Sequence, residues 1–319
     1  MERFAEYLRI SRQPMTGLLF VFPFLLLHEA GIRIMSHPVA HSGGGVWLRG
    51  ILTEGLGLPE LAIPLLPIVT LVVWQYLENR PGNTPPMRVF PEYGTSSEKR
   101  SSGSGHEAVS ENETSSGHVK KSEGTGNSGR NDGSGMEDTE RTSPEKTSGT
   151  PITFRQRFQV LPDMLPESVA LAIVLRLLLE VEAWGVEWLT GNGPALRLTD
   201  PVTLREGVAI LVSHCGAGLY EEYLFRLILT GGLAMMIRSY LPERSSWLIA
   251  IVVSSVFFVA AHHLGRGGEP ILWREPAFQL SVLFRFSASM ILGVIYWKRG
   301  FGITVGSHVF YNLFIRIVP

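Results

Sequence analysis

The chain has 319 residues, of which 45% are hydrophobic, and its formal net charge at pH 7 is −1. A charge this close to zero provides no basic surface for nucleic acid, so no nucleic-acid partner is expected. The single cysteine, Cys215, excludes an intramolecular disulfide and a metal site built from several thiolates.

Apolar segments recur along the chain at roughly the 20-residue length that is needed to cross a bilayer. They fall at residues 14–35, 58–77, 164–190, 206–237, 246–264, 276–297 and 301–317. No small-residue cleavage site follows the first segment, which is therefore interpreted as an anchor rather than a cleavable signal peptide. We predict an all-α, polytopic transmembrane bundle of about seven helices in a lipid bilayer.

A long polar segment separates the second apolar segment from the third. Residues 93–150 consist mostly of Ser, Gly, Thr, Glu, Lys and Asn, and they contain too few apolar side chains to offset the entropy of an ordered chain. The sequence therefore predicts three parts. These are an N-terminal transmembrane helical pair at residues 1–92, a disordered Ser/Gly-rich linker at 93–150 and a helical core at 151–319.

The charges at the ends of the apolar segments favour one orientation. Arg9 and Arg12 precede the first segment, and Lys298 and Arg299 would lie on the same side of the membrane. Because basic residues are enriched on the cytoplasmic side, we expect a cytoplasmic N-terminus and a protein that is integral to the bacterial plasma membrane.

Three of the apolar segments contain polar residues that are expensive to insert into a membrane. A charged side chain at the bilayer centre costs about 2.5–3.5 kcal/mol on insertion scales, so such groups are expected to face protein or a wet cavity. The side chains concerned are Glu221, Glu222, Arg226, His262, His263, His308 and Asn312.

The spacing of these residues separates the two carboxylates. On a helix Glu222 and Arg226 are four residues apart and close enough to pair. Glu221 points about 100° away from Glu222 and is left available for chemistry. His308 and Asn312 are also four residues apart and project into one space. Only one of the two adjacent histidines, expected to be His262, can face that space.

These residue types are sufficient for the hydrolysis of an amide by water. Glu221 can act as a general base for a water molecule, and a neutral imidazole can position the same water. An amide N–H such as that of Asn312 can stabilise a developing oxyanion. No covalent nucleophile is needed in this scheme.

The three motifs resemble those of a known protease family. Glu221-Glu222-x-x-x-Arg226, Phe258-x-x-x-His262 and His308-x-x-x-Asn312 occur in this order, each within an apolar segment. They are similar to the motifs of the CPBP family, which groups CAAX proteases with bacteriocin-processing enzymes. The resemblance covers roughly residues 163–319 and leaves the first 150 residues uncovered.

The resemblance implies an all-helical, glutamate-dependent intramembrane endopeptidase whose substrate is a membrane-associated protein or peptide. In that reading Glu221 and His262 activate water, and His308 and Asn312 form the oxyanion site. Glu222 and Arg226 have supporting roles.

Metal dependence stays open at this point. Glu221, His262 and His308 could form a zinc site of the His₂Glu type with an open position for water. The family has been discussed as glutamate-dependent, with its dependence on metal disputed.

Two other classes of function compete with hydrolysis. A non-catalytic membrane scaffold or immunity protein could keep the same bundle. A transporter would be expected to show discontinuous helices or paired repeats, and the sequence shows neither.

Other polar residues within the apolar segments have simpler interpretations. Arg176 and Glu180 are four residues apart and are expected to pair. His214 is seven residues before Glu221 on nearly the same face, and we expect a structural role for it. Arg285 could contact a substrate carboxylate or an acidic neighbour. Gly293 is expected to permit close helix contact.

Overall fold

The structure is a computed structural model that describes residues 2–35, 50–55, 57–78, 152–191, 203–264 and 268–317. Every regular element in these ranges is a helix, and the ranges contain no strand. The predicted linker at residues 93–150 lies outside the described residues, so its predicted disorder stays a prediction.

The described residues of the N-terminal part form two longer helices and three short ones. An amphipathic helix α1 is followed by the apolar helix α2, which begins at Pro14, where the fixed φ of proline suits the first helical turn. The elements are α1 (Glu2–Ser11), α2 (Pro14–Ile34), the π-helix η1 (Gly50–Gly55), the 3₁₀-helix η2 (Glu60–Ala62) and α4 (Leu65–Glu78).

The C-terminal part begins with two capped helices and ends with two helices joined by a sharp turn. Thr153 and Thr203 each form a capping box, with Gln156 and Glu206 respectively. Gly300, with φ of 80°, ends α9 directly before α10. The elements are α5 (Phe154–Thr190), α6 (Leu204–Glu222), the π-helix η3 (Tyr223–Thr230), α7 (Gly231–Ile237), α8 (Glu243–His263), α9 (Pro276–Arg299) and α10 (Phe301–Ile317).

Each of the seven predicted spans contains a helix, although the second, residues 58–77, is helical only in η2 and from Leu65 onward. Among the described residues three helices, α2, α8 and α9, are both long enough and apolar enough to cross a membrane. The helix α10 has only 17 residues, and α4 is shorter still. The predicted fold class, an all-helical membrane bundle, is confirmed, while the count of about seven spans stays a prediction.

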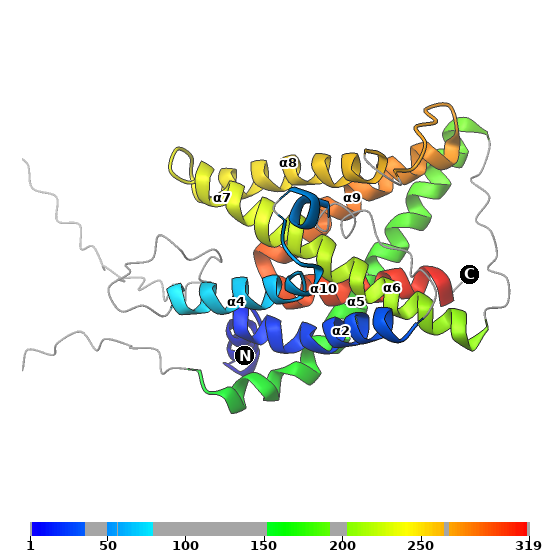
Figure 1. Cartoon of the computed structure of the whole chain (residues 1–319). Helices are drawn as coiled ribbons and strands as arrows, with labels where there is room; N and C mark the ends of the chain where they lie inside the picture. Colours follow the sequence, from blue (N-terminus) through cyan, green and yellow to red (C-terminus); the bar gives the residue numbers. More distant parts are fainter. Residues whose placement is uncertain are drawn as a thin grey trace, which may run out of the picture. The chain divides into compact units, whose positions relative to one another are not determined.

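The helix α10 occupies the middle of the bundle and packs against α2, α5, α6 and α9 (Figure 1). The helix α8 packs against α9 and η3. Because α2 also packs against α6, the described N-terminal helices belong to the same compact unit as the C-terminal helices, which comprises residues 1–92 and 152–319.

Two glycines of α6 allow neighbouring helices to approach closely. A Cβ atom at Gly216 would lie 2.1 Å from Cε1 of His28 on α2. A Cβ atom at Gly218 would lie 2.5 Å from Cγ2 of Val309 on α10 and 3.0 Å from its backbone nitrogen. Small residues at helix contacts are typical of membrane bundles, and here they bring α10 against the end of α6 that carries the two glutamates.

We predict that Gly218→Ala destabilises the protein by roughly 1–3 kcal/mol, because the added methyl group overlaps Val309 and forces α10 away from α6. Gly207→Ala on the same helix is the matched control, since nothing lies within 4 Å of the added atom. The control should gain about 0.5–1 kcal/mol from its higher helix propensity. Thermal unfolding in detergent micelles measures both. If the two variants were equally stable, the contact between Gly218 and Val309 would not limit how closely α10 packs against α6.

Candidate active site

The predicted catalytic residues come from three helices, α6, α8 and α10. Glu221 and Glu222 are the last two residues of α6, directly before the π-helix η3. His262 lies in the last turn of α8, and His308 lies in the middle of α10. Glu221 is 3% exposed and His308 6%, so the site is enclosed by the bundle.

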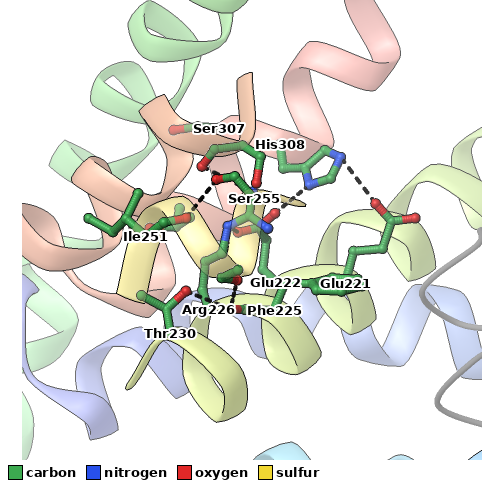
Figure 2. Close-up of polar contacts among 12 residues, drawn as sticks. Glu221, Glu222, Phe225, Arg226, Thr230, Ile251, Ser255, Ser307 and His308 are labelled. Carbon is green, nitrogen blue, oxygen red and sulfur yellow. Dashed lines mark hydrogen bonds and ion pairs between the residues drawn. The ribbon is translucent and has the colours of Figure 1, made fainter. Parts of the chain in front are cut away.

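A buried network connects Glu222, Arg226 and His308. The predicted ion pair forms, with 3.0 Å between Nε of Arg226 and Oε2 of Glu222. Both residues are almost completely buried. The other carboxylate oxygen of Glu222, Oε1, lies 2.7 Å from Nδ1 of His308 (Figure 2). Glu222 therefore joins the arginine on its own helix to the histidine on α10.

These hydrogen bonds determine which nitrogen of each neutral histidine carries the proton. Because an ionised carboxylate only accepts, Nδ1 of His308 donates to Glu222 and its Nε2 is left with a lone pair. Nδ1 of His262 lies 2.8 Å from the carbonyl oxygen of Phe258, which also only accepts. Nε2 of His262 is therefore left with a lone pair as well.

Both lone pairs face Glu221. Nε2 of His308 is 3.8 Å from Oε2 of Glu221, and Nε2 of His262 is 4.0 Å from Oε1. These distances exceed the length of a direct hydrogen bond, about 3.2 Å at most. A water molecule about 2.8 Å from both atoms of either pair would bridge that pair, because its two O–H groups can donate to the carboxylate oxygen and to the imidazole nitrogen. The convergence of Glu221, His262 and His308 was expected from the sequence, and the structure places them together.

The same three side chains do not fit a zinc ion as they are arranged. Zinc–nitrogen and zinc–oxygen bonds of about 2.0–2.2 Å at tetrahedral angles place ligand atoms roughly 3.3–3.5 Å apart. The separations of 3.8 and 4.0 Å are wider than this. Within the described residues, no three His, Cys, Asp or Glu side chains are grouped so that they could hold a metal ion.

The fourth predicted residue, Asn312, is less closely connected to the other three than they are to one another. It lies one turn beyond His308 on α10 and is partly buried. In the described part of the chain no hydrogen bond joins it to Glu221, His262 or His308, and its oxyanion role stays a prediction. His263 contacts the backbone oxygen of Glu269 and the ring of Phe278.

One aromatic ring contacts all three motifs. The ring centroid of Phe258 lies 4.8 Å from that of His262 and 6.5 Å from that of His308. The guanidinium carbon of Arg226 lies 4.8 Å from the same centroid, within range of a cation–π interaction. The apolar ring of Phe258 thus packs against both histidines and helps to fix their positions. Its place in the second motif was visible in the sequence, but its contacts were not.

The π-helix η3 has hydroxyl partners that the sequence did not indicate. Thr230, five residues after Phe225, donates its hydroxyl to the Phe225 carbonyl at 2.7 Å (Figure 2). Ser254 of α8 donates to the same oxygen at 2.7 Å. A π-turn widens the helix and leaves carbonyl groups without their usual donors, and π-turns are frequent at functional sites. The two hydroxyls satisfy this oxygen, and Ser254 connects α8 to η3 at the residue directly before Arg226.

Two arginines that lie elsewhere in the apolar segments form ion pairs. Arg176 and Glu180 form the predicted pair. Arg285 pairs with Glu269, an acidic residue in the segment between α8 and α9. His214 lies on α6, seven residues or about two turns before Glu221.

One known protein family matches the C-terminal part of the chain. Residues 204–314 match the family model of the type II CAAX prenyl endopeptidases, described as Rce1-like. This match confirms the resemblance that the three motifs indicated. It spans about a third of the chain and includes every predicted site residue. It starts at α6, whereas the resemblance in the sequence extended back to residue 163. No curated protein and no solved structure matches the chain.

We predict that Arg226→Ala destabilises the protein by about 3–5 kcal/mol, because Glu222 would keep its charge in the core without its cation. Arg238→Ala is the control. Its partner Glu243 is 3.9 Å away and both side chains are about one-third exposed, so a change within about 0.5 kcal/mol is expected. Chemical or thermal unfolding in detergent reports both values. A stable Arg226→Ala variant that lost only activity would assign Arg226 to the reaction rather than to the fold.

Proposed function

We propose that the protein is an intramembrane endopeptidase that hydrolyses a peptide bond of a membrane-associated protein or peptide. At the level of the family, the Rce1-like match supports a CAAX-type protease in a membrane. The observation that carries the specific proposal is the enclosed space in which Glu221 and the lone pairs of His262 and His308 face one another.

In the proposed reaction Glu221 removes a proton from a water molecule that is also held by His262. The oxygen of this water forms a bond to the carbonyl carbon of the peptide, and the carbonyl electrons move to its oxygen. Glu221 then passes the proton to the amide nitrogen, and the C–N bond breaks. The products are a carboxylic acid and an amine, so the step balances without an added reagent.

Glu222 limits how His308 can take part in this reaction. A neutral His308 that donates from Nδ1 to Glu222 has no proton on Nε2 with which to stabilise an oxyanion. It gains that ability only when Nε2 also carries a proton. We propose that Asn312 and the imidazolium of His308 together bind the oxyanion.

No metal ion is needed for this reaction, and we propose that the enzyme works without one. The distances around Glu221 support this proposal, because they suit a bridging water better than tetrahedral zinc. The printed family name does not establish a prenylated substrate for this chain, since a fold and its motifs do not fix a substrate.

We further propose that the N-terminus lies in the cytoplasm, with the protein in the bacterial plasma membrane. The basic residues that support this orientation do share one side, because Arg299 donates to the hydroxyl of Ser11 at 3.2 Å. A Cβ atom at Gly300 would also lie 2.9 Å from the backbone oxygen of Arg12. The start of α2 and the turn between α9 and α10 are therefore adjacent.

Glu221→Gln should abolish cleavage, with a loss of turnover on the order of 10²–10⁴-fold, while the bundle keeps nearly its full stability. The measurement is a proteomic comparison of membranes that carry wild-type protein or the variant, which reports activity and substrate together. Glu187→Gln, at an exposed position of α5, is the matched control and should cleave as the wild type does.

The same comparison is repeated with the chelator 1,10-phenanthroline, and the cleavage products should be unchanged. Cleavage by Glu221→Gln at the wild-type rate would remove Glu221 from the reaction. Loss of cleavage with the chelator, restored by added zinc, would replace the metal-free reaction with a zinc-dependent one.

A further inference from the structure

Arg285, an arginine near the candidate active site, forms an ion pair with a carboxylate that lies outside the helices. Arg285 lies in the middle of α9, and its side chain is only 20% exposed. Its Nη1 is 2.8 Å from Oε2 of Glu269 and its Nη2 is 2.5 Å from Oε1, so both carboxylate oxygens are bound. The side chain of Glu269 is 49% exposed, and the residue belongs to the segment between α8 and α9.

This pair lies beside the residues that are proposed to act on the peptide. The backbone N–H of Glu269 donates to the carbonyl oxygen of His262 at 2.9 Å. Through Glu269, Arg285 is therefore connected to His262, one of the two histidines that face Glu221.

Arg285 differs from Arg226 in where its acidic partner lies. Arg226 pairs with a fully buried carboxylate on its own helix, and exchange of that partner would require the core to open. Glu269 is half exposed and comes from a segment outside the helices, so another carboxylate can replace it without unpacking α8 or α9. The two-point geometry shows that a planar carboxylate fits this guanidinium, as is typical of arginine.

We propose that Arg285 is the binding subsite for a carboxylate of the substrate, and that Glu269 occupies this subsite when no substrate is bound. The inference rests on the proposed function. The carboxylate is either the C-terminus of the substrate or an acidic side chain near the scissile bond. The hydrogen bonds from Arg285 lower the pKa of Glu269, so Glu269 is ionised at neutral pH and competes with the substrate.

The test uses binding rather than cleavage, so that it does not depend on turnover. The full-length Glu221→Gln protein in detergent is titrated with three fluorescent N-dodecanoyl tetrapeptides of small apolar residues. One peptide has a free C-terminal carboxylate, the second has a C-terminal amide, and the third has the amide together with one aspartate. A preference for the first peptide identifies a C-terminal carboxylate, and equal preference for the first and third identifies any carboxylate.

The acid peptide should bind on the order of tenfold more tightly than the amide. Arg285→Gln should remove this preference, Arg285→Lys should retain part of it, and Glu269→Gln should strengthen binding of the acid peptide by freeing Arg285. Arg274→Gln, at an exposed position of the same segment, is the control and should leave the preference unchanged.

Equal binding of the acid and amide peptides, or binding of neither, would overturn the proposal. So would weaker acid binding in Glu269→Gln, because Glu269 would then be a structural partner rather than a competitor. Selective binding of the acid peptide together with no cleavage by the wild-type protein would instead contradict the proposed function and leave the subsite in place.

Discussion

The site depends on one buried interaction, the contact of Glu222 with both Arg226 and His308. Burial of a charge pair is costly, and such a pair persists only where both charges have well-placed partners. Here one oxygen of Glu222 faces the guanidinium and the other accepts the proton of His308 from α10. This arrangement fixes the ring of His308 and leaves its second nitrogen facing Glu221. This arrangement supports the proposal that the two adjacent glutamates have different roles, Glu222 in the fold and Glu221 in the reaction.

The residues packed around this network fix the distances between its polar atoms. Gly218 lets α10 approach α6, which brings His308 within reach of Glu222. Phe258 lies against Arg226 and both histidines, so a movement of α8 would disturb all three motifs. The hydroxyls of Thr230 and Ser254 complete the hydrogen bonds of the widened turn that follows Glu222. The geometry of the polar site therefore depends on the packing of the bundle.

The sequence was sufficient to predict the helices, their apolar character and the pair of Glu222 with Arg226, because these follow from local spacing. It also predicted that Glu221, His262 and His308 meet. It could not predict the bond between Glu222 and His308, since periodicity gives the face of a helix but not its rotation against another helix 86 residues away. The partner of Arg285 was left open for a similar reason, because Glu269 lies in a polar segment without periodicity.

The most direct test of this account is the protonation of His308, measured by ¹⁵N NMR of histidine-labelled protein in detergent. The signals of His308 are identified by comparison with a His308→Gln sample. We expect a proton on Nδ1, seen as a one-bond ¹⁵N–¹H coupling, which is lost from that position in Glu222→Leu. A neutral His308 whose only proton is on Nε2 would contradict the account, because Nδ1 could not then donate to Glu222.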